Sequence, residues 1–403
     1  MTTINLRFQP FDTWFFRESR PQGSVGASDL GSLFPPPMRS LAGAVRTAIG
    51  DDWHRQNGTQ WRDLHKLEAL QQVIGLGDDL GALSFEGPFL SRNGERLYPA
   101  PLVLAEKKIE IKNDENNNKK NKKNTFLVFL MAPGDAVECD LGRVRLPSFP
   151  SSVPGLSDTR GAKRLDDAWI TRAGLIKVLE GQAPEPGSVF KRDSLLHEES
   201  RLGIARSNAA GSVIEGLLYQ TRHLRLNNEE NISIDISVND GSKWQPQAGQ
   251  TVRLGAEGRL SSLESVAAAA TLPAPSASKK TKGIVLYLLT PALFRDASGQ
   301  PCAIPTGFRA VLHDGITVWE GECHGIALRI HAMALGKAHR EGGWDMAQHR
   351  SRPVQSYVGA GASYFAEVLT GEINAAIKAL HLRQLGDEQG YGRGQMACGL
   401  WTI

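Results

Sequence analysis

The sequence predicts an α+β protein with two ferredoxin-like (RRM-like) domains, several insertions and one projecting β-hairpin. Two observations lead to this fold class. In each half of the chain, strand-like runs are separated by two helical segments, without the long β-α-β-α alternation of a doubly wound sheet. A stretch of small, prolyl and basic residues, 269–283, has the composition of a linker. We therefore expect an N-terminal domain over 1–268 and a C-terminal domain over 284–403.

Composition limits the class of protein. A chain of 403 residues is long enough for two or three domains with ample cores. Its formal net charge of +3 is too small to identify a nucleic-acid binder, so any basic surface must be local. Four cysteines stand far apart, and neither a basic-then-apolar leader nor a long apolar run occurs. These features predict a cytoplasmic protein with reduced thiols and no membrane association.

Hydrophobic periodicity predicts the elements of the first half in order. An alternating strand opens the chain, and a helix follows three consecutive prolines, which cannot continue a helix themselves. The predicted strands are 4–11, 83–90, 97–104, 126–131 and 232–238, the last half-buried, and the predicted helices are 38–49, 53–72 and 166–179. Residues 106–124, rich in asparagine and lysine, have no apolar periodicity and should form a mobile insertion.

The opening stretch combines aromatic and basic residues. Trp14, Phe15 and Phe16 stand beside Arg17, with Arg20 close by. Stacking faces next to positive charge are what single-stranded nucleic acid requires of a protein. A core strand is the alternative interpretation, because aromatic residues beside arginine also occur in ordinary cores.

The segment that follows offers further candidate contacts. Glycines and serines in 17–32 would let the backbone approach a phosphate, and Ser24 and Gly26 are the candidates there. Arg39 and Arg46 lie off the apolar face of the helix that follows the prolines. A plain connecting loop before a core helix is the alternative.

A second informative stretch is the predicted hairpin 201–226. Two strand-like runs flank a turn rich in Asn, Ala and Gly. An exposed hairpin with arginines on its limbs can follow a phosphate backbone, although solvated arginines on a structural hairpin remain the alternative. The candidate RNA-binding residues here are Arg201, Arg206, Tyr219, Arg222 and Arg225.

The second half predicts strands 284–289, 325–335, 363–368 and 396–401, and a helix 372–385. A glycine-rich loop, 386–399, carries Tyr391 and Arg393 and suits backbone contact with RNA, unless it is a bare turn before the last strand. Its G-x-G-x-x-A pattern lies too near the end of the sequence for the helix and strand that a dinucleotide site needs.

These motifs, read as ordered strings, resemble the RAMP proteins of CRISPR effector complexes. The string DTWFFRE at 12–18, followed by SLFPPP at 32–37, is most similar to the family of third subunits of the type III-B (Cmr) complex. The R-x-G-I and L-Y segments of the hairpin also match, at Arg201, Gly203, Ile204 and Tyr219.

The resemblance implies the same ferredoxin-like fold, a thumb hairpin that contacts the guide RNA, and a glycine-rich loop near the carboxy terminus. It adds Arg259 as a candidate, in a turn where Ala256 replaces a glycine of the family pattern. It also implies the partners, namely the 5′ handle of the CRISPR guide RNA (crRNA), the Cas10-type large subunit and the Cmr backbone subunit.

A search for catalytic motifs is negative. The sequence contains no complete P-loop, no G-x-S-x-G, no H-E-x-x-H and no G-G-D-D, so we expect no catalytic residue, metal or cofactor. The predicted function is a non-catalytic guide-RNA-binding subunit. Two other classes stay open: a metal-independent endoribonuclease for precursor crRNA, with His54 after the first helix as the general base to test, and a pure protein–protein adaptor.

Overall fold

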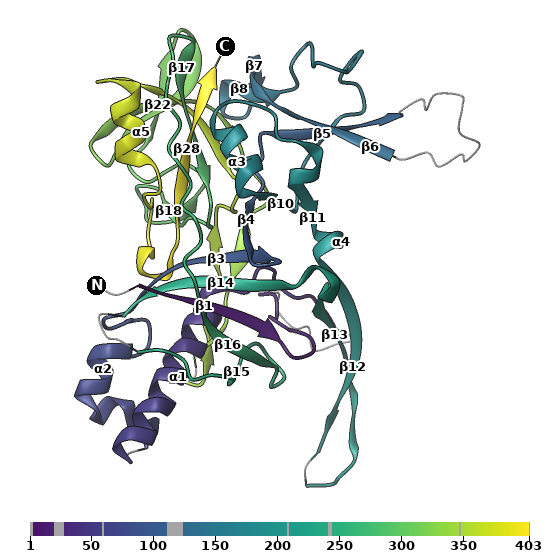
Figure 1. Ribbon diagram of the computed structural model, residues 1–403, viewed down its shortest axis with the longest axis vertical. Coiled ribbons are helices and arrows are strands. Elements are labelled where there is room, and N and C mark those ends of the chain that lie inside the picture. The colour runs from purple at the N-terminus through teal and green to yellow at the C-terminus, as the bar shows by residue number, and fades with distance from the viewer. Residues whose placement is uncertain are drawn as a thin grey trace.

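The structure is a computed structural model, in which we describe residues 3–19, 28–58, 60–110, 124–207, 209–240, 244–345 and 348–402. It is a mixed α+β protein, rich in strands and with few helices (Figure 1). Two large antiparallel sheets form its body, and a long hairpin projects from one end (Figure 1).

An eight-stranded sheet organises the first half. Its order is β11 (Val189–Lys191), β10 (Ala168–Thr171), β4 (Glu95–Pro99), β3 (Ser84–Arg92), β14 (Ile232–Asn239), β1 (Thr3–Pro10), β16 (Leu260–Val266) and β15 (Gln250–Arg253). The strand predicted at 232–238 is present, but it is buried on both faces and not half-buried. Both faces are buried because the strand lies in the middle of the sheet. Asp235, on the second face, forms an ion pair with Arg7 at 2.8 Å.

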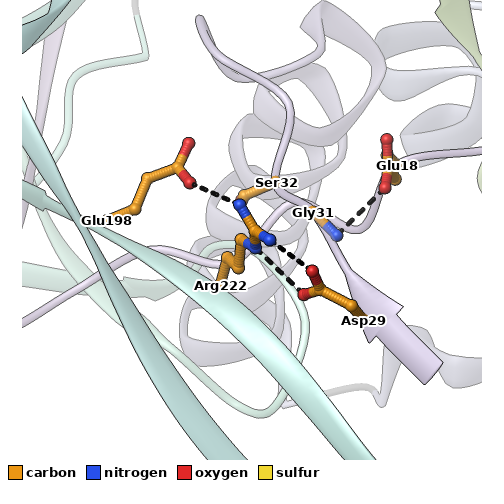
Figure 2. Close-up of a pocket in the computed structure, with 6 residues that line it drawn as sticks. All are labelled: Glu18, Asp29, Gly31, Ser32, Glu198 and Arg222. Atoms are coloured by element: carbon orange, nitrogen blue, oxygen red, sulfur yellow. Dashed lines mark hydrogen bonds and ion pairs between the residues drawn. The ribbon is translucent and has the colours of Figure 1, made fainter. Parts of the chain in front are cut away.

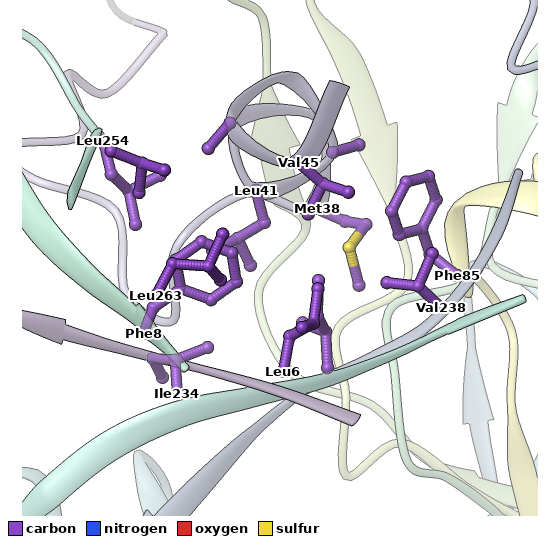
Figure 3. Packing of buried hydrophobic residues seen from close by; sticks show 14 of the residues in the cluster. Leu6, Phe8, Met38, Leu41, Val45, Phe85, Ile234, Val238, Leu254 and Leu263 are labelled. Atoms are coloured by element: carbon purple, nitrogen blue, oxygen red, sulfur yellow. The ribbon is translucent and has the colours of Figure 1, made fainter. Parts of the chain in front are cut away.

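Helix α1 (Met38–Asn57) packs on this sheet. Met38, Leu41 and Val45 follow helical spacing and lie against Leu6 and Phe8 of β1 in one apolar cluster (Figure 3). The helix is longer than predicted and ends only at Gly58, whose left-handed φ of 66° suits a glycine. The second predicted helix is therefore the last turns of α1, a 3₁₀ helix η1 (Trp61–Lys66) and a short α2 (Glu68–Ile74).

The helix predicted at 166–179 is wrong in its first part. Residues 168–171 form β10, and α3 (Arg172–Leu179) begins only after Thr171. The hydroxyl of Thr171 accepts a hydrogen bond from the amide of Gly174 at 3.1 Å. This side-chain cap fixes the start of the helix, and Leu175, Val178 and Leu179 then face the core.

A six-stranded sheet organises the second half. Its order is β20 (Arg309–His313), β21 (Ile316–Cys323), β22 (Ile326–Ala334), β27 (Ser363–Val368), β17 (Thr281–Leu288) and β28 (Met396–Thr402). Helix α5 (Ile373–Leu380) packs against it through Ile377 and Leu380. It is shorter than the predicted helix 372–385, because the amide of Leu382 instead donates to the carbonyl of Met396 at 2.9 Å.

The two halves share apolar packing. Phe89 and Tyr98 of the first sheet lie in one buried cluster with Val285, Tyr287 and Phe365 of the second. The predicted linker has no helix or strand up to Lys280, and β17 begins at Thr281.

Small sheets form the insertions. The segment predicted to be mobile, 106–124, begins and ends as strand, because β5 (Leu104–Glu110) pairs with β6 (Asn124–Leu130) through backbone hydrogen bonds that need no apolar side chains. Residues 111–123 lie outside the described residues. The other insertion strands are β7 (Ala132–Cys139), β8 (Gly142–Ser148) and β9 (Lys163–Arg164).

The projecting hairpin consists of β12 (Leu196–Arg206) and β13 (Val213–Leu226), as predicted (Figure 1). A short strand β2 (Ser28–Leu30) joins it at its root. The remaining elements are η2 (Pro186–Ser188), α4 (Arg192–Leu195), η3 (Asn228–Glu230), β18 (Phe294–Arg295), β19 (Pro301–Cys302), β23 (His339–Glu341), β24 (Trp344–Asp345), β25 (Arg350–Ser351), β26 (Gln355–Tyr357) and η4 (Gln389–Tyr391).

Candidate nucleic-acid interface

The fold brings together two stretches that are almost 200 residues apart in the sequence. Strand β2 of the opening stretch pairs in parallel with β13, with Ser28 opposite Tyr219 and Leu30 opposite Thr221. Trp14 forms a further antiparallel bridge with Leu224. The opening stretch therefore lies along the root of the hairpin, and their charged residues face one another.

An ion-pair network occupies this root. Asp12 accepts hydrogen bonds from Arg201 at 2.9 Å and Arg225 at 2.7 Å, and Arg259 approaches it at 3.5 Å. Glu199 contacts both Arg201 and Arg225. Hydrogen bonds from Arg201 and Arg225 lower the pKa of Asp12 to about 2, so its carboxylate stays charged at neutral pH.

Arg222 forms a second group of ion pairs on the other side of β13. It contacts Asp29 of β2 through two guanidinium nitrogens and approaches Glu198 at 3.6 Å (Figure 2). A cavity of about 260 Å³ lies here, lined by Glu18, Asp29, Gly31, Ser32, Glu198 and Arg222. Three carboxylates against one guanidinium make this cavity acidic, so it is not a phosphate pocket.

The hairpin arginines are therefore not the free, outward-facing cations that the sequence suggests. Arg201, Arg222 and Arg225 are each ion-paired to carboxylates of the same chain, although all three side chains stay partly exposed. Arg206 lies near the tip, exposed, and donates to the carbonyl of Gly211 at 3.0 Å. Tyr219 is half-buried, and its ring lies over Gly203 so closely that no side chain would fit there.

His223 belongs to the basic cluster on the limbs of the hairpin but is not one of the predicted RNA-binding residues. Its buried ring lies 3.2 Å from the hydroxyl of Thr13 and 3.2 Å from a carboxylate oxygen of Glu257, and it stacks on Phe15. Burial lowers the pKa of His223, and the charges of Arg201 and Arg259 lower it further. The ring links the hairpin to the opening stretch through Thr13 and Phe15, and only its position between two arginines hinted at this role.

The aromatic residues of the opening stretch are core residues, and the prediction of a stacking platform is wrong for them. Trp14, Phe15 and Phe16 are all buried. The indole nitrogen of Trp14 donates to the hydroxyl of Ser261 at 2.7 Å. Phe11, three residues before Trp14, is the exposed aromatic among the described residues of this stretch.

Three other predicted contacts lie between α1 and the glycine-rich loop, away from the hairpin. Arg39 pairs with Glu388 at 2.7 Å and stacks on Tyr391, with its guanidinium carbon 4.5 Å from the ring centroid. Arg46 donates to the carbonyl of Gly77 at 3.0 Å, and burial lowers its pKa. Arg39 therefore joins the first half to the glycine-rich loop of the second half, whereas the hydrogen bond of Arg46 stays within the first half.

Arg393 is the clearest correction among the candidates. It is 1% exposed, it pairs with the equally buried Glu341, and it lies over the ring of Tyr357. A guanidinium in this position cannot reach RNA, so Arg393 is a structural residue. The glycine-rich loop folds back into the protein because Gly392 and Gly394 adopt left-handed φ angles of 71° and 70°.

The other candidates are placed as follows. Arg17 is exposed and lies next to the root of the hairpin, since its backbone bridges to Ser32. Arg20, Ser24 and Gly26 lie outside the described residues. His54 is exposed in the last turns of α1, not after the helix.

Neither a metal cluster nor a membrane-spanning helix is found among the described residues. They contain no cluster of three or more His, Cys, Asp or Glu side chains that could hold a metal ion. No helix in the same part of the chain is long and apolar enough to cross a bilayer.

Comparison with solved structures gives distant similarities. A chain of the type III-B Cmr-beta complex bound to cognate target RNA and AMPPnP is 15% identical, with a TM-score of 0.43 over 90% of this chain and 86% of that chain. A chain of the Cmr-beta complex bound to cognate target RNA is also 15% identical, with a TM-score of 0.41 and the same coverage. A chain of the Csm3-Csm4 subcomplex of a type III-A CRISPR-Cas interference complex is 11% identical, with a TM-score of 0.33 over 91% and 94%.

TM-scores in this range transfer neither a site nor an activity. No curated protein matches the chain. The model of the CRISPR-associated protein family Cas_Cmr3, in contrast, matches residues 6–401. This match covers nearly the whole sequence and confirms the resemblance that the opening and hairpin motifs carry: the chain belongs to the Cas_Cmr3 family of CRISPR-associated proteins.

Proposed function

We propose that this chain is a non-catalytic RNA-binding subunit of a cytoplasmic type III-B CRISPR (Cmr) effector complex. It holds the 5′ handle of the crRNA and joins the Cas10-type subunit to the backbone subunit in antiviral defence. Membership of the Cas_Cmr3 family supports the complex, and the hairpin and its root support the place where RNA binds.

The observation that carries the proposal is that Arg201 and Arg225, at the hairpin root, use only some of their N–H donors in contacts with carboxylates. Arg201 contacts its two carboxylates through Nη2 alone, and Arg225 uses Nε and Nη2. No described residue accepts a hydrogen bond from Nε or Nη1 of Arg201, or from Nη1 of Arg225. A guanidinium has five N–H donors, so these free edges can bind phosphate oxygens while Asp12 and Glu199 hold the side chains in place.

A protein–protein adaptor is the second candidate, and one observation favours it. The hairpin exposes several apolar side chains, which suit contact with a neighbouring subunit better than contact with phosphates. They are Leu202, Ile204, Val213, Ile214 and Leu218. In an adaptor these apolar side chains contact a neighbouring protein, whereas in the proposed RNA-binding subunit the guide RNA runs along the hairpin past them.

We also propose that both halves are ferredoxin-like units. In the second half, β17 and β27 are central, β28 and β22 flank them, and α5 connects β27 to β28. That is the strand arrangement of a β-α-β-β-α-β unit in which the hairpin β20–β21 replaces the first helix. The first half would be a similar unit enlarged by insertions.

Incubation of the purified protein with labelled repeat RNA, alone and with its partner subunits, separates the three functions. Binding without cleavage supports the proposal, cleavage supports the endoribonuclease, and partner binding without RNA binding supports the adaptor. Arg201→Ala with Arg225→Ala should lower the salt dependence of RNA affinity by about 0.7 units of slope per lost phosphate contact. Arg295→Ala is the matched control, since Arg295 is also a partly exposed arginine, paired with Asp387 at 2.7 Å in the other half.

A further inference from the structure

Residues 339–345 and 348–357 form a two-stranded ribbon that no motif in the sequence predicts as a binding element. β23 pairs with β26, and β24 pairs with β25 at its outer end, with Trp344 opposite Ser351. Ion pairs fix the ribbon to the body of the protein. Arg352 contacts Asp345 at 3.1 Å and also contacts Asp78, which follows α2. Glu341, at the base of the ribbon, is buried against Arg393.

The exposed surface of the ribbon is aromatic and basic. Trp344 is 57% exposed, and none of the described aromatic rings packs on it. Arg340 and Arg350 are exposed, and neither forms an ion pair with a described residue. Both carboxylates of the described ribbon, Glu341 and Asp345, are paired and turned inward. The charge that the described ribbon presents to solvent is therefore positive.

The ribbon also lies next to the opening stretch. Gly342 is so close to Ser19 that a Cβ built on it would stand 3.1 Å from the hydroxyl oxygen of Ser19. Ser19 is two residues from the exposed Arg17, which adjoins the hairpin root through Ser32. The surface at the hairpin root and the ribbon are thus connected by the opening stretch.

We propose that the ribbon is a second contact for single-stranded RNA, in which Trp344 stacks on an unpaired base and Arg340 and Arg350 bind the flanking phosphates. An exposed indole on a ribbon that also carries two exposed cations, with no exposed carboxylate among its described residues, matches the requirements of a single-stranded nucleic acid, whose bases stack and whose backbone is anionic. This inference rests on the proposed function, because it extends the path of the same guide RNA beyond the hairpin.

The test uses the full-length protein in its reconstituted complex and a fluorescein-labelled guide RNA with its 5′ handle. Trp344→Ala should weaken RNA affinity by about tenfold, and Trp344→Phe should retain most of it because a ring remains. Trp344→Leu keeps an apolar side chain without a stacking face and should behave like alanine. Arg340→Ala and Arg350→Ala should each reduce the salt slope by about 0.7, whereas the exposed Arg309→Ala on the other sheet should not.

Each outcome has one meaning. The ribbon contact is overturned if Trp344→Leu binds RNA with full affinity. It is also overturned if all ribbon variants keep their RNA affinity while the Arg201/Arg225 variant binds RNA more weakly. Both outcomes leave the proposed function intact. Loss of subunit assembly by Trp344→Ala, with unchanged RNA affinity of the assembled fraction, assigns the ribbon to a protein partner and also overturns it. Absence of RNA binding by the unmodified complex overturns the proposed function and the inference together. The melting temperature of every variant should match the parent, because these side chains are exposed.

Discussion

Arg393→Ala should destabilise the protein strongly, although the sequence suggests that this arginine binds RNA. Arg393 and Glu341 are 1% and 3% exposed, so removal of the guanidinium leaves in the interior a carboxylate whose remaining ion-pair partner among the described residues is His339, at 2.8 Å. Removal of one partner from a buried ion pair typically costs about 3–5 kcal/mol. The contact of the guanidinium with the ring of Tyr357 is lost as well.

The pH dependence of this effect has a definite sign. Burial tends to raise the pKa of Glu341, but Arg393 and His339 outweigh it and hold the pKa at about 2. A carboxyl pKa that is lowered on folding contributes stability above its unfolded value of about 4.3, and this contribution is lost as the pH falls toward 2. Without Arg393, burial dominates and Glu341 takes up a proton more readily. The difference in stability between parent and variant should therefore shrink as the pH is lowered.

Urea unfolding followed by tryptophan fluorescence at pH 7 and pH 5 measures both effects. The double variant Arg393→Met with Glu341→Leu is the control, because apolar residues of similar volume can replace a buried pair at little cost. A loss below about 1 kcal/mol for Arg393→Ala, or a double variant no more stable than the single one, would refute the reasoning. RNA affinity of the folded fraction should be unchanged.

Three further predictions concern the opening stretch, the hairpin root and His54 of α1. Trp14→Ala should lower the free energy of unfolding by about 3–5 kcal/mol, because Trp14 is buried, whereas Phe11→Ala should change it by no more than about 0.5 kcal/mol, because Phe11 is exposed. Urea unfolding measures both, and equal effects would contradict the division into core and surface aromatics. Because burial lowers the pKa of His223, the neutral ring contributes to stability above about pH 6.5, and this contribution is lost as the pH falls through the lowered pKa. In His223→Gln the melting temperature should therefore decline less on acidification than in the parent. An unchanged dependence of melting temperature on pH would contradict a buried neutral ring. His54→Ala should leave target cleavage by the reconstituted complex intact, while loss of precursor crRNA processing by the isolated protein would favour the endoribonuclease.

The sequence correctly predicted those elements whose side-chain pattern or turn residues lie within the element itself. The hairpin turn between β12 and β13, the alternation in β1 and the apolar run of β17 were all visible because side-chain period and turn residues report directly on the backbone. The helix 166–179 failed because its periodicity continues through β10, and only the cap at Thr171 marks the true start.

The candidate site was predicted in its residues but not in its contacts. Arg201, Arg225 and Arg259 are where the motifs put them, yet the nearest of them in the sequence is 189 residues from their partner Asp12, so the ion pairs depend on long-range strand pairing. Arg393 looked exposed because glycine-rich loops usually are, and its burial follows from packing between the two halves. Exposure of an aromatic residue is likewise a property of the fold, which is why Trp14 is buried although its basic neighbours suggested a stacking surface, and why the sequence did not point to the exposed Trp344.

The most direct test of the central claim is position-specific crosslinking of guide RNA to the hairpin. Leu202 on β12 and Leu312 on β20 are matched probes, with 74% and 76% of their surface exposed on opposite halves of the chain. Each is replaced by a photoreactive phenylalanine, and the reconstituted complex is irradiated with crRNA labelled in its 5′ handle. The proposal predicts an RNA crosslink from position 202 and none from position 312. Crosslinks from 312 alone, or from 202 to protein subunits without any RNA, would contradict it.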